Sequence, residues 1–295
     1  MKITQFSWAQ TGANVLLAFA LTALTGCISF GGNAVAPLPT AGSDAHPSRP
    51  LTAKEISDKA LEAEKHRKLK TEAGVVYSFQ RKIVIDELDG KKKRHKTRTF
   101  LSFSDHRDPV LLLYDGKKPT PEQVEKERKE IHKHQIKIMG KGDSAKDPDH
   151  KGDANLMVRN IEKHQDKFTP HLIGTETVND RPAYILQFLH DPEKPFKETM
   201  ANEVLKHVLI KIWIDQKEFQ VAKAEVVLAN PLYIIGGLAA TVNTFKLTAY
   251  QKRLTPEIWT DHRVTSRIEG RVLWTPHIIN FSSESTDFKP VPKND

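Results

Sequence analysis

VLIKIWIDQKEFQVAKAEVVL, residues 208–228, is the stretch that decides the fold. In its first half, Ile210, Ile212 and Ile214 alternate with Lys211, Trp213 and Asp215. Successive side chains of a β-strand point to opposite faces of a sheet, so this pattern predicts a strand with the isoleucines on one face. A short polar link and a returning strand predict a hairpin. The second arm shifts its pattern from Phe219 and Val221 to Ala222, Ala224, Val226 and Leu228, which indicates a β-bulge.

Similar patterns predict strands on both sides of this hairpin. Turn signals such as Asp89-Gly90 separate short segments with an apolar or period-two pattern. The expected strands cover residues 74–86, 96–104, 109–114, 172–178, 183–189, 240–253, 257–268 and 271–282. Because the links are short and parallel pairs need long crossovers, we expect about ten antiparallel strands.

Helices are expected mainly in the first half of the chain. Thr52 and Glu55 form a capping-box pattern that opens a helix to about residue 70. Thr120 followed by Pro121 predicts the start of a densely charged helix to about residue 138. A polar loop is expected over residues 140–152. Shorter helices are expected over 153–163 and 198–207.

These elements predict an α+β, β-rich fold. A long meandering antiparallel sheet tends to curl, so we expect a half-open β-barrel with the helices packed on its concave side. Residues 51–288 would form this single domain, with a charged helical insertion near 120–152 and a tail at 289–295.

The first fifty residues indicate export and anchoring. Residues 3–43 contain no Asp, Glu, Lys or Arg, and an apolar run of about ten residues follows the short basic start, which predicts a signal peptide over 1–26. A membrane-spanning helix needs roughly 20 apolar residues. Leu-Thr-Gly-Cys at 24–27 resembles the bacterial lipobox, which implies a diacylglycerol on the Cys27 thiol. Residues 27–50 would be a lipidated flexible tether. The alternative is an uncleaved anchor with an incidental cysteine.

Composition limits the classes of function. The chain has 295 residues, a net charge of +8, 38% hydrophobic residues and one cysteine. These values fit a packed soluble domain, and a single cysteine excludes an intrachain disulfide and a cysteine-based zinc site. A basic surface could meet anionic lipid or nucleic acid. The export signal argues against nucleic acid.

Several motifs carry a resemblance to a known family. They are Leu-Leu-Tyr-Asp-Gly-Lys at 112–117, Leu-Ile-Gly-Thr-Glu-Thr at 172–177, Asp-Arg-Pro-Ala-Tyr at 180–184 and Trp-Ile-Asp at 213–215. Over about residues 51–285 the chain resembles the bacterial outer-membrane lipoprotein-sorting family. The resemblance implies that acyl chains of lipoproteins bind between the concave sheet and the helices. The lipobox resembles that of the anchored receptor, and Ile28 and Ser29 after the cysteine resemble an outer-membrane sorting signal. The larger size and the charged segment at 120–152 depart from the family.

Three groups of residues are candidate contacts. The uncharged segment 231–240 could meet acyl chains or pack as core, through Leu232, Tyr233, Ile234, Ile235 and Leu238. Trp213, Trp259 and Trp274 could line the cavity or belong to the core. A basic run at the tip of the first hairpin could contact an anionic surface or be a solvated turn that protects an edge strand: Lys91, Lys92, Lys93, Arg94 and Lys96.

Neither catalysis nor a cofactor is expected. The sequence has no G-x-S-x-G elbow, P-loop, G-x-G-x-x-G or HExxH motif. His132 and His134 are too close in sequence to share one helix face, so no metal site is expected. We predict a non-enzymatic outer-membrane lipoprotein that faces the periplasm and binds a lipid, acyl chain or lipoprotein, with a role in their trafficking. The alternative is an envelope interaction protein whose filled barrel binds a protein or the cell wall. The oligomeric state stays open.

Overall fold

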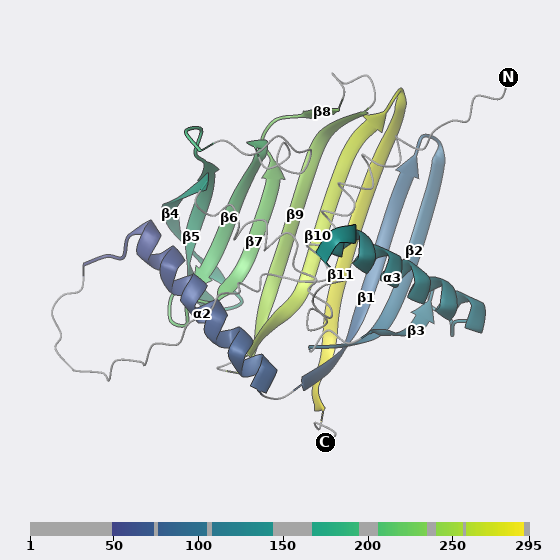
Figure 1. Cartoon of the computed structure of the whole chain (residues 1–295), viewed down its shortest axis with the longest axis horizontal. Helices are drawn as coiled ribbons and strands as arrows, with labels where there is room; N and C mark the ends of the chain where they lie inside the picture. The colour runs from purple at the N-terminus through teal and green to yellow at the C-terminus, as the bar shows by residue number, and fades with distance from the viewer. Residues whose placement is uncertain are drawn as a thin grey trace.

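One large antiparallel sheet with helices on one side makes up the protein (Figure 1). The computed structural model describes residues 49–73, 76–104, 108–143, 167–194, 206–234, 240–255 and 258–291. The predicted signal peptide, the lipid site at Cys27 and most of the predicted tether lie outside the described residues. So do the predicted helix at 153–163 and most of the one at 198–207.

The sheet has eleven strands, and every pairing in it is antiparallel. Its order is β3-β2-β1-β11-β10-β9-β7-β6-β5-β4, with β8 paired to β9. The strands are β1 Val76–Asp89, β2 Lys92–Phe103, β3 Val110–Tyr114, β4 Phe168–Val178, β5 Arg181–His190, β6 Val208–Asp215, β7 Val221–Leu228, β8 Leu232–Ile234, β9 Ala240–Thr255, β10 Ile258–Val272 and β11 Thr275–Val291. The predicted fold class is confirmed: an α+β, β-rich, half-open antiparallel sheet with helices on one side.

Two helices accompany the sheet in the described part of the chain. Helix α2 covers Ala53–Ala73 and helix α3 covers Pro121–Asp143. In the first cap, the Thr52 N–H donates to Glu55 Oε2 at 2.8 Å and the Glu55 N–H donates to Thr52 Oγ1 at 3.3 Å. Thr120 and Gln123 form the same reciprocal pair at α3. Both predicted helix starts are therefore confirmed.

Helix α3 continues past its predicted end to Asp143, so the expected loop is wrong over residues 140–143, and residues 144–152 lie outside the described part of the chain. The helix includes the glycines at 140 and 142. A glycine inside a helix costs only about 1 kcal/mol relative to alanine, which strong helix formers before it can offset.

The hairpin β6–β7 matches its prediction closely. Strand β6 has the expected bounds, and the pairing register shifts between Trp213 and Ile214, which confirms a bulge. The isoleucines of β6 are buried in the main core with Ile56 and Ala60 of α2. We call this side of the sheet the helix face, because α2 and α3 both lie on it (Figure 1). The other side is called the opposite face.

The boundary between β10 and β11 differs from the prediction. The predicted strands leave residues 269–270 between them, but Gly270 lies inside β10, and the turn falls at Leu273 and Trp274. A Cβ atom on Gly270 would lie 2.2 Å from the Thr241 carbonyl oxygen. The glycine is needed there because the neighbouring backbone approaches closely. Trp274 therefore belongs to a turn, whereas the sequence predicts it inside a strand.

Two further boundaries moved. Strand β2 starts at Lys92, so the basic residues after Lys91 belong to the strand and not to the hairpin tip. Acidic residues at 86, 87 and 89 of β1 lie opposite them, and such cross-strand pairs favour extension of the ladder. Strand β8 was not expected inside the segment 231–240, and β11 runs past residue 289 to Val291, where the predicted tail had been placed.

Candidate functional site

A continuous row of side chains crosses the helix face from β5 to β2. The pairing register places its members next to one another on adjacent strands. The row reads Phe188, Ile210, Val226, Leu247, Ser266, Phe281, Ile85 and Lys96. At about 4.8 Å between strands it extends roughly 30 Å. It is therefore a long apolar row, buried from Ile210 to Phe281, with one serine in it and an exposed lysine at its end.

A second row runs beside the first, closer to the lower ends of the strands in Figure 1. It reads Leu186, Ile212, Ala224, Ala249, Val264, Ser283, Ile83 and Arg98. One end is buried in the core that includes Ile56 and Ala60 of α2. The other end is Arg98, which contacts α3. The two helices therefore stand at opposite ends of the same apolar surface.

Buried polar groups without partners interrupt this surface. Ser266 is 6% exposed and Gln251 is 1% exposed. Within the part of the chain that the structure describes, the Ser266 hydroxyl and both polar atoms of the Gln251 side chain have no hydrogen-bond partner. Leaving a buried polar group unpaired costs about 1–3 kcal/mol. Of these groups, only the Ser266 hydroxyl belongs to the two rows, where it lies between Leu247 and Phe281.

Sequence reasoning missed these polar residues. Ser283 and Ser285 follow Ile279 and Phe281 at the same period of two, and Ser266 precedes Ile268 in the same way. A serine at an inward position of a strand was a readable signal. Its significance depends on the partners across the sheet, which only the register reveals.

Arg98 attaches helix α3 to the sheet. Its guanidinium donates from Nε to Glu127 Oε1 of α3 at 2.8 Å and from a terminal nitrogen to Asp115 Oδ1 at 2.9 Å. It also lies 3.3 Å from the centroid of the Tyr114 ring. The Arg98 side chain is 9% exposed, so this is a sheltered ion pair. The hydrogen bond from the Thr97 N–H and the nearby Arg98 charge lower the pKa of Asp115.

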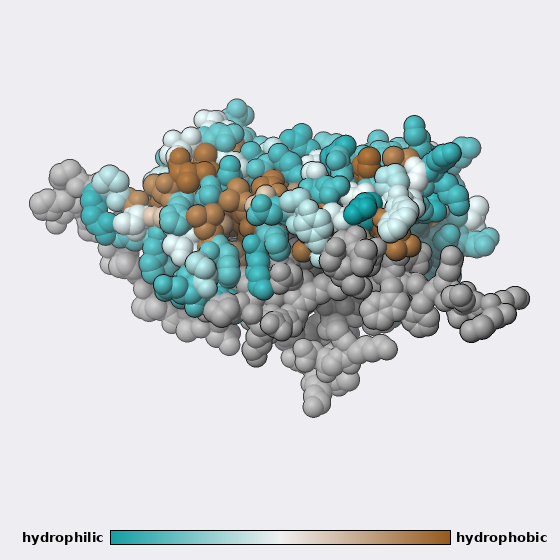
Figure 2. All heavy atoms as spheres, turned by 90° about the horizontal axis from the view of Figure 1, so that it is seen from above, coloured by the Kyte–Doolittle hydropathy of each residue, from teal (hydrophilic) through white to brown (hydrophobic). Residues whose placement is uncertain are grey.

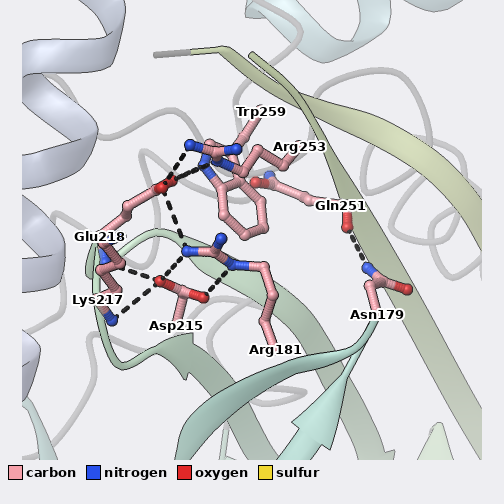
Figure 3. Close-up of polar contacts among 8 residues, drawn as sticks. All are labelled: Asn179, Arg181, Asp215, Lys217, Glu218, Gln251, Arg253 and Trp259. Carbon is pink, nitrogen blue, oxygen red and sulfur yellow. Dashed lines mark hydrogen bonds and ion pairs between the residues drawn. The ribbon is translucent and has the colours of Figure 1, made fainter. Parts of the chain in front are cut away.

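A polar network closes the lower end of the sheet (Figure 3). Arg181 binds Asp215 through two hydrogen bonds of 2.6 and 2.9 Å, and Glu218 accepts from Arg253 and from the Trp259 indole at 3.1 and 2.8 Å. Burial alone would raise the pKa of Asp215. The Arg181 hydrogen bonds and charge, with two backbone N–H donors, outweigh burial and lower that pKa. Because every charged group here has a partner, the network joins three hairpins and offers no free acid or base.

Trp213 and Trp259 lie away from the helix face. Both belong to a smaller buried cluster with Val178, Ala183 and Ala222. The Trp213 indole N–H donates to Glu176 at 2.7 Å, and the Lys223 ammonium lies 3.8 Å from the centroid of its ring. These two tryptophans are packed and hydrogen-bonded on the opposite face, so they do not line the apolar rows.

The predicted apolar segment 231–240 divides between core and surface. Leu232 is buried in the main core, whereas Tyr233 is 61% exposed. Ile234 is the last residue of β8, and Ile235 and Leu238 lie outside the described residues. Trp274 is 74% exposed at the β10–β11 turn. The members of this predicted group therefore separate into buried and exposed sets.

The basic residues of the first hairpin are all exposed. Arg94 pairs with Glu87 at 3.4 Å across the hairpin. For the lysines at 91, 92, 93 and 96 the structure shows no ion pair within its described ranges. Among those same residues, no group of His, Cys, Asp and Glu could hold a metal ion, and no helix is long and apolar enough to cross a membrane.

Comparison with known proteins identifies similar solved structures. No protein-family model and no curated protein sequence matches the chain. A LolA superfamily protein from Nitrosomonas europaea is 13% identical over 83% of this chain and 96% of its own, with a TM-score of 0.23. An outer membrane lipoprotein-sorting protein domain from Vibrio parahaemolyticus is 11% identical over 81% and 95%, with a TM-score of 0.33. The MucA/MucB complex of Pseudomonas aeruginosa contains a chain that is 10% identical over 82% and 99%, with a TM-score of 0.22.

Lipoprotein-sorting proteins, the group that the sequence resembles, are thus among the solved structures similar to this chain. The identities and TM-scores are low, so the likeness transfers no residue role. The function has to follow from the chain's own surfaces.

Proposed function

We propose that this protein is a lipid-anchored envelope lipoprotein that binds a hydrophobic ligand on its helix face. The ligand class is an acyl chain, carried by a lipid or a lipoprotein, and binding involves no covalent chemistry. The observation that carries the proposal is the apolar surface that runs from the core beneath α2 to Arg98 beneath α3. Transfer of such ligands within an outer membrane that faces the periplasm is the corresponding cellular role.

The size of the surface is adequate for such a ligand. Burial of apolar area contributes about 25 cal/mol per Å². One acyl chain that buries a few hundred Å² would bind with roughly micromolar affinity after the cost of association. Its elongated shape matches rows that cross most of the sheet.

The unpaired polar group favours an acyl ester or amide over a plain hydrocarbon. The Ser266 hydroxyl, which lies in the first row, can donate to a carbonyl oxygen. A ligand that satisfies this hydroxyl recovers part of the cost of its burial. Fatty acyl lipids and lipopeptides contain carbonyl groups next to their chains.

The test compares two substitutions at adjacent positions that point to opposite faces. Ser283 lies on the helix face between Val264 and Ile83, and Ser282 lies on the opposite face between Thr265 and Val84. Ser283→Phe places a ring among the apolar rows, whereas Ser282→Phe does not. We expect native mass spectrometry of the purified chain to show a co-purified lipid or lipopeptide in wild type and in Ser282→Phe, with at least a tenfold loss in Ser283→Phe.

Melting temperatures check that both variants fold, because overpacking a core costs about 1–3 kcal/mol. A ligand-free mass for wild type, together with an unchanged melting temperature on addition of fatty acids or diacyl lipopeptides, would contradict the proposal. That outcome would favour the alternative of an envelope interaction protein, whose partner could then be sought by cross-linking.

A further inference from the structure

Two hairpin ends and a short strand meet at the upper end of the sheet. The register places Tyr233 of β8, Thr241 of β9 and Arg271 of β10 next to one another. The Gly90 N–H of the β1–β2 turn donates to the Pro276 carbonyl oxygen at 2.9 Å. This bond holds the basic hairpin against the start of β11, directly after Trp274. We call this group the upper rim, which consists of Lys91, Lys93, Tyr233, Arg271, Leu273 and Trp274.

Apolar side chains on the rim are exposed to an unusual degree. Trp274 is 74% exposed, Tyr233 61% and Leu273 56%. Figure 2 views the molecule from this end and shows some apolar residues (brown) at the surface among hydrophilic ones (teal); Trp and Tyr rank near the middle of its hydropathy scale and are therefore not brown. Trp and Tyr combine a large apolar ring with one polar group, a combination suited to the boundary between water and an apolar phase.

Leu273 is unfavourable at its position in two respects. Its φ is +52°, a left-handed conformation that glycine adopts without steric cost and leucine does not. Its side chain is also largely exposed. Neither the left-handed backbone nor the exposed side chain stabilises the folded domain, so we expect the Leu273 side chain to contact another molecule.

Free positive charge lies beside these apolar groups. The side chains of Lys91, Lys93 and Arg271 are exposed, and the described residues supply no ion-pair partner for any of them. The nearby carboxylate of Asp89 is already engaged, because it pairs with His277 at 3.1 Å and lies 3.9 Å from Arg94. The rim therefore presents uncompensated cations next to exposed aromatic and aliphatic side chains.

We propose that the upper rim docks on an anionic lipid bilayer. Lys91, Lys93 and Arg271 contact the acidic headgroups, while Trp274 and Leu273 enter the interface between headgroups and acyl chains. Aromatic side chains concentrate at this depth in membrane proteins, and basic clusters bind acidic lipid surfaces. A protein-binding surface would have few charges at its centre, whereas here the cations alternate with the apolar tips. This docking does not depend on a ligand on the helix face.

The charge contribution is tested with two matched double variants of the predicted mature chain. Both begin at Ile28, so that neither the predicted signal peptide nor a lipid on Cys27 contributes. Lys91 and Lys93→Gln removes two charges from the rim, and Lys217 and Lys252→Gln removes two exposed charges from the other end of the sheet. Flotation uses phosphatidylcholine vesicles with and without phosphatidylglycerol. We expect the rim variant to bind the anionic vesicles about thirtyfold more weakly, which is about 1 kcal/mol per lysine, and the control to bind like the parent.

Insertion is tested separately through Trp274. With vesicles that contain brominated lipids, we expect fluorescence quenching in the parent chain, which lacks Trp8, and its loss in Trp274→Phe, because Trp213 and Trp259 are buried. Leu273→Gly removes the strained conformation without loss of folding and is expected to weaken vesicle binding. Val110→Ser, an exposed apolar residue on β3, is the control.

Equal binding of both lysine variants, or equal binding to neutral and anionic vesicles, would overturn the proposal. Quenching that persists in Trp274→Phe would do the same for the insertion step. Loss of ligand binding to the helix face would leave these results unchanged, so the two proposals fail independently.

Discussion

Asp215 shows how one residue joins several elements. It lies at the end of β6, is 1% exposed, and accepts hydrogen bonds from Arg181 and from the backbone N–H groups of Lys217 and Glu218. These bonds close the β6–β7 turn and hold it to the β4–β5 hairpin. A buried carboxylate is tolerated only when paired in this way, because an isolated buried charge is very costly.

At this scale we predict a pH-dependent effect of Asp215→Asn. Removal of one partner of a buried ion pair costs about 3 kcal/mol or more. Because the pKa of Asp215 is lowered in the folded state, its contribution is complete above the unfolded pKa of about 3.9 and is lost as the pH falls through the folded value. Urea unfolding should therefore show a large deficit for the variant at neutral pH that shrinks below about pH 4.

Asp180→Asn provides the matched control. Asp180 is exposed in the neighbouring turn with a φ of +62°, a conformation that asparagine also adopts readily. Its free energy of unfolding should change little. A deficit of Asp215→Asn that is constant from neutral to acid pH would show that the carboxylate charge is not the stabilising feature.

Helix α3 illustrates the scale of the element. Its residues are largely charged, and its attachment to the sheet depends on the contact between Glu127 and Arg98. Elsewhere on the helix, Glu125 pairs with Arg128 and Lys129 at the surface, and such exposed pairs contribute little. Among the ion pairs described for residues 121–132 of α3, the pair of Glu127 with Arg98 is the sheltered one, so we expect it to contribute most to the position of the helix over the apolar rows.

We predict that Glu127→Gln loosens α3 from the sheet. A hydrogen bond to a charged group is worth about 1.5–3 kcal/mol, so the helix should exchange its backbone amide hydrogens faster while the strands remain protected. Glu125→Gln, two residues earlier on the same helix, should change exchange only slightly. Hydrogen exchange read by mass spectrometry separates the two variants, and equal protection of α3 in both would refute the role of the Arg98 contact.

At the scale of the molecule, three surfaces differ in composition. The helix face carries the apolar rows, and the opposite face carries the smaller buried cluster with Trp213. The upper rim carries exposed cations and exposed apolar side chains. Leu232 and Val242 of the helix-face core lie at the same end as the rim. A molecule docked by its rim would therefore turn the upper edge of this core toward the bilayer, with the apolar rows crossing the strands below that edge.

The proposed anchor gives a prediction for the whole protein in the cell. Cys27→Ser should leave the precursor uncleaved or release the chain from membranes after a high-salt wash, which screens electrostatic contacts of the rim. Ser29→Ala, two residues later, should remain mature and membrane-bound. Cell fractionation and intact mass spectrometry measure both properties. A mature Cys27→Ser chain that stays in the membrane fraction after the wash would disprove the anchor.

Local patterns in the sequence predicted most elements correctly. The isoleucine alternation of β6, the bulge in β7 and the caps at Thr52 and Thr120 were all read directly, because each depends on residues within one turn or one strand. The incorrect boundaries lie where a segment distant in the sequence determines the local structure. The predicted break at 269–270 falls inside β10, where Gly270 packs against the backbone of Thr241, a residue far away in the sequence.

The sequence by itself determined a β-rich antiparallel sheet with capped helices, because strand alternation and helix capping are local properties of the chain. Only the tertiary structure decided which residues share a surface. The register across strands placed Ser266 on the helix face between Leu247 and Phe281, and it placed Trp213 on the opposite face. A backbone hydrogen bond brought the turn at Gly90 against Pro276. A shift of one residue in any pairing would reverse these faces, and no local pattern specifies that pairing.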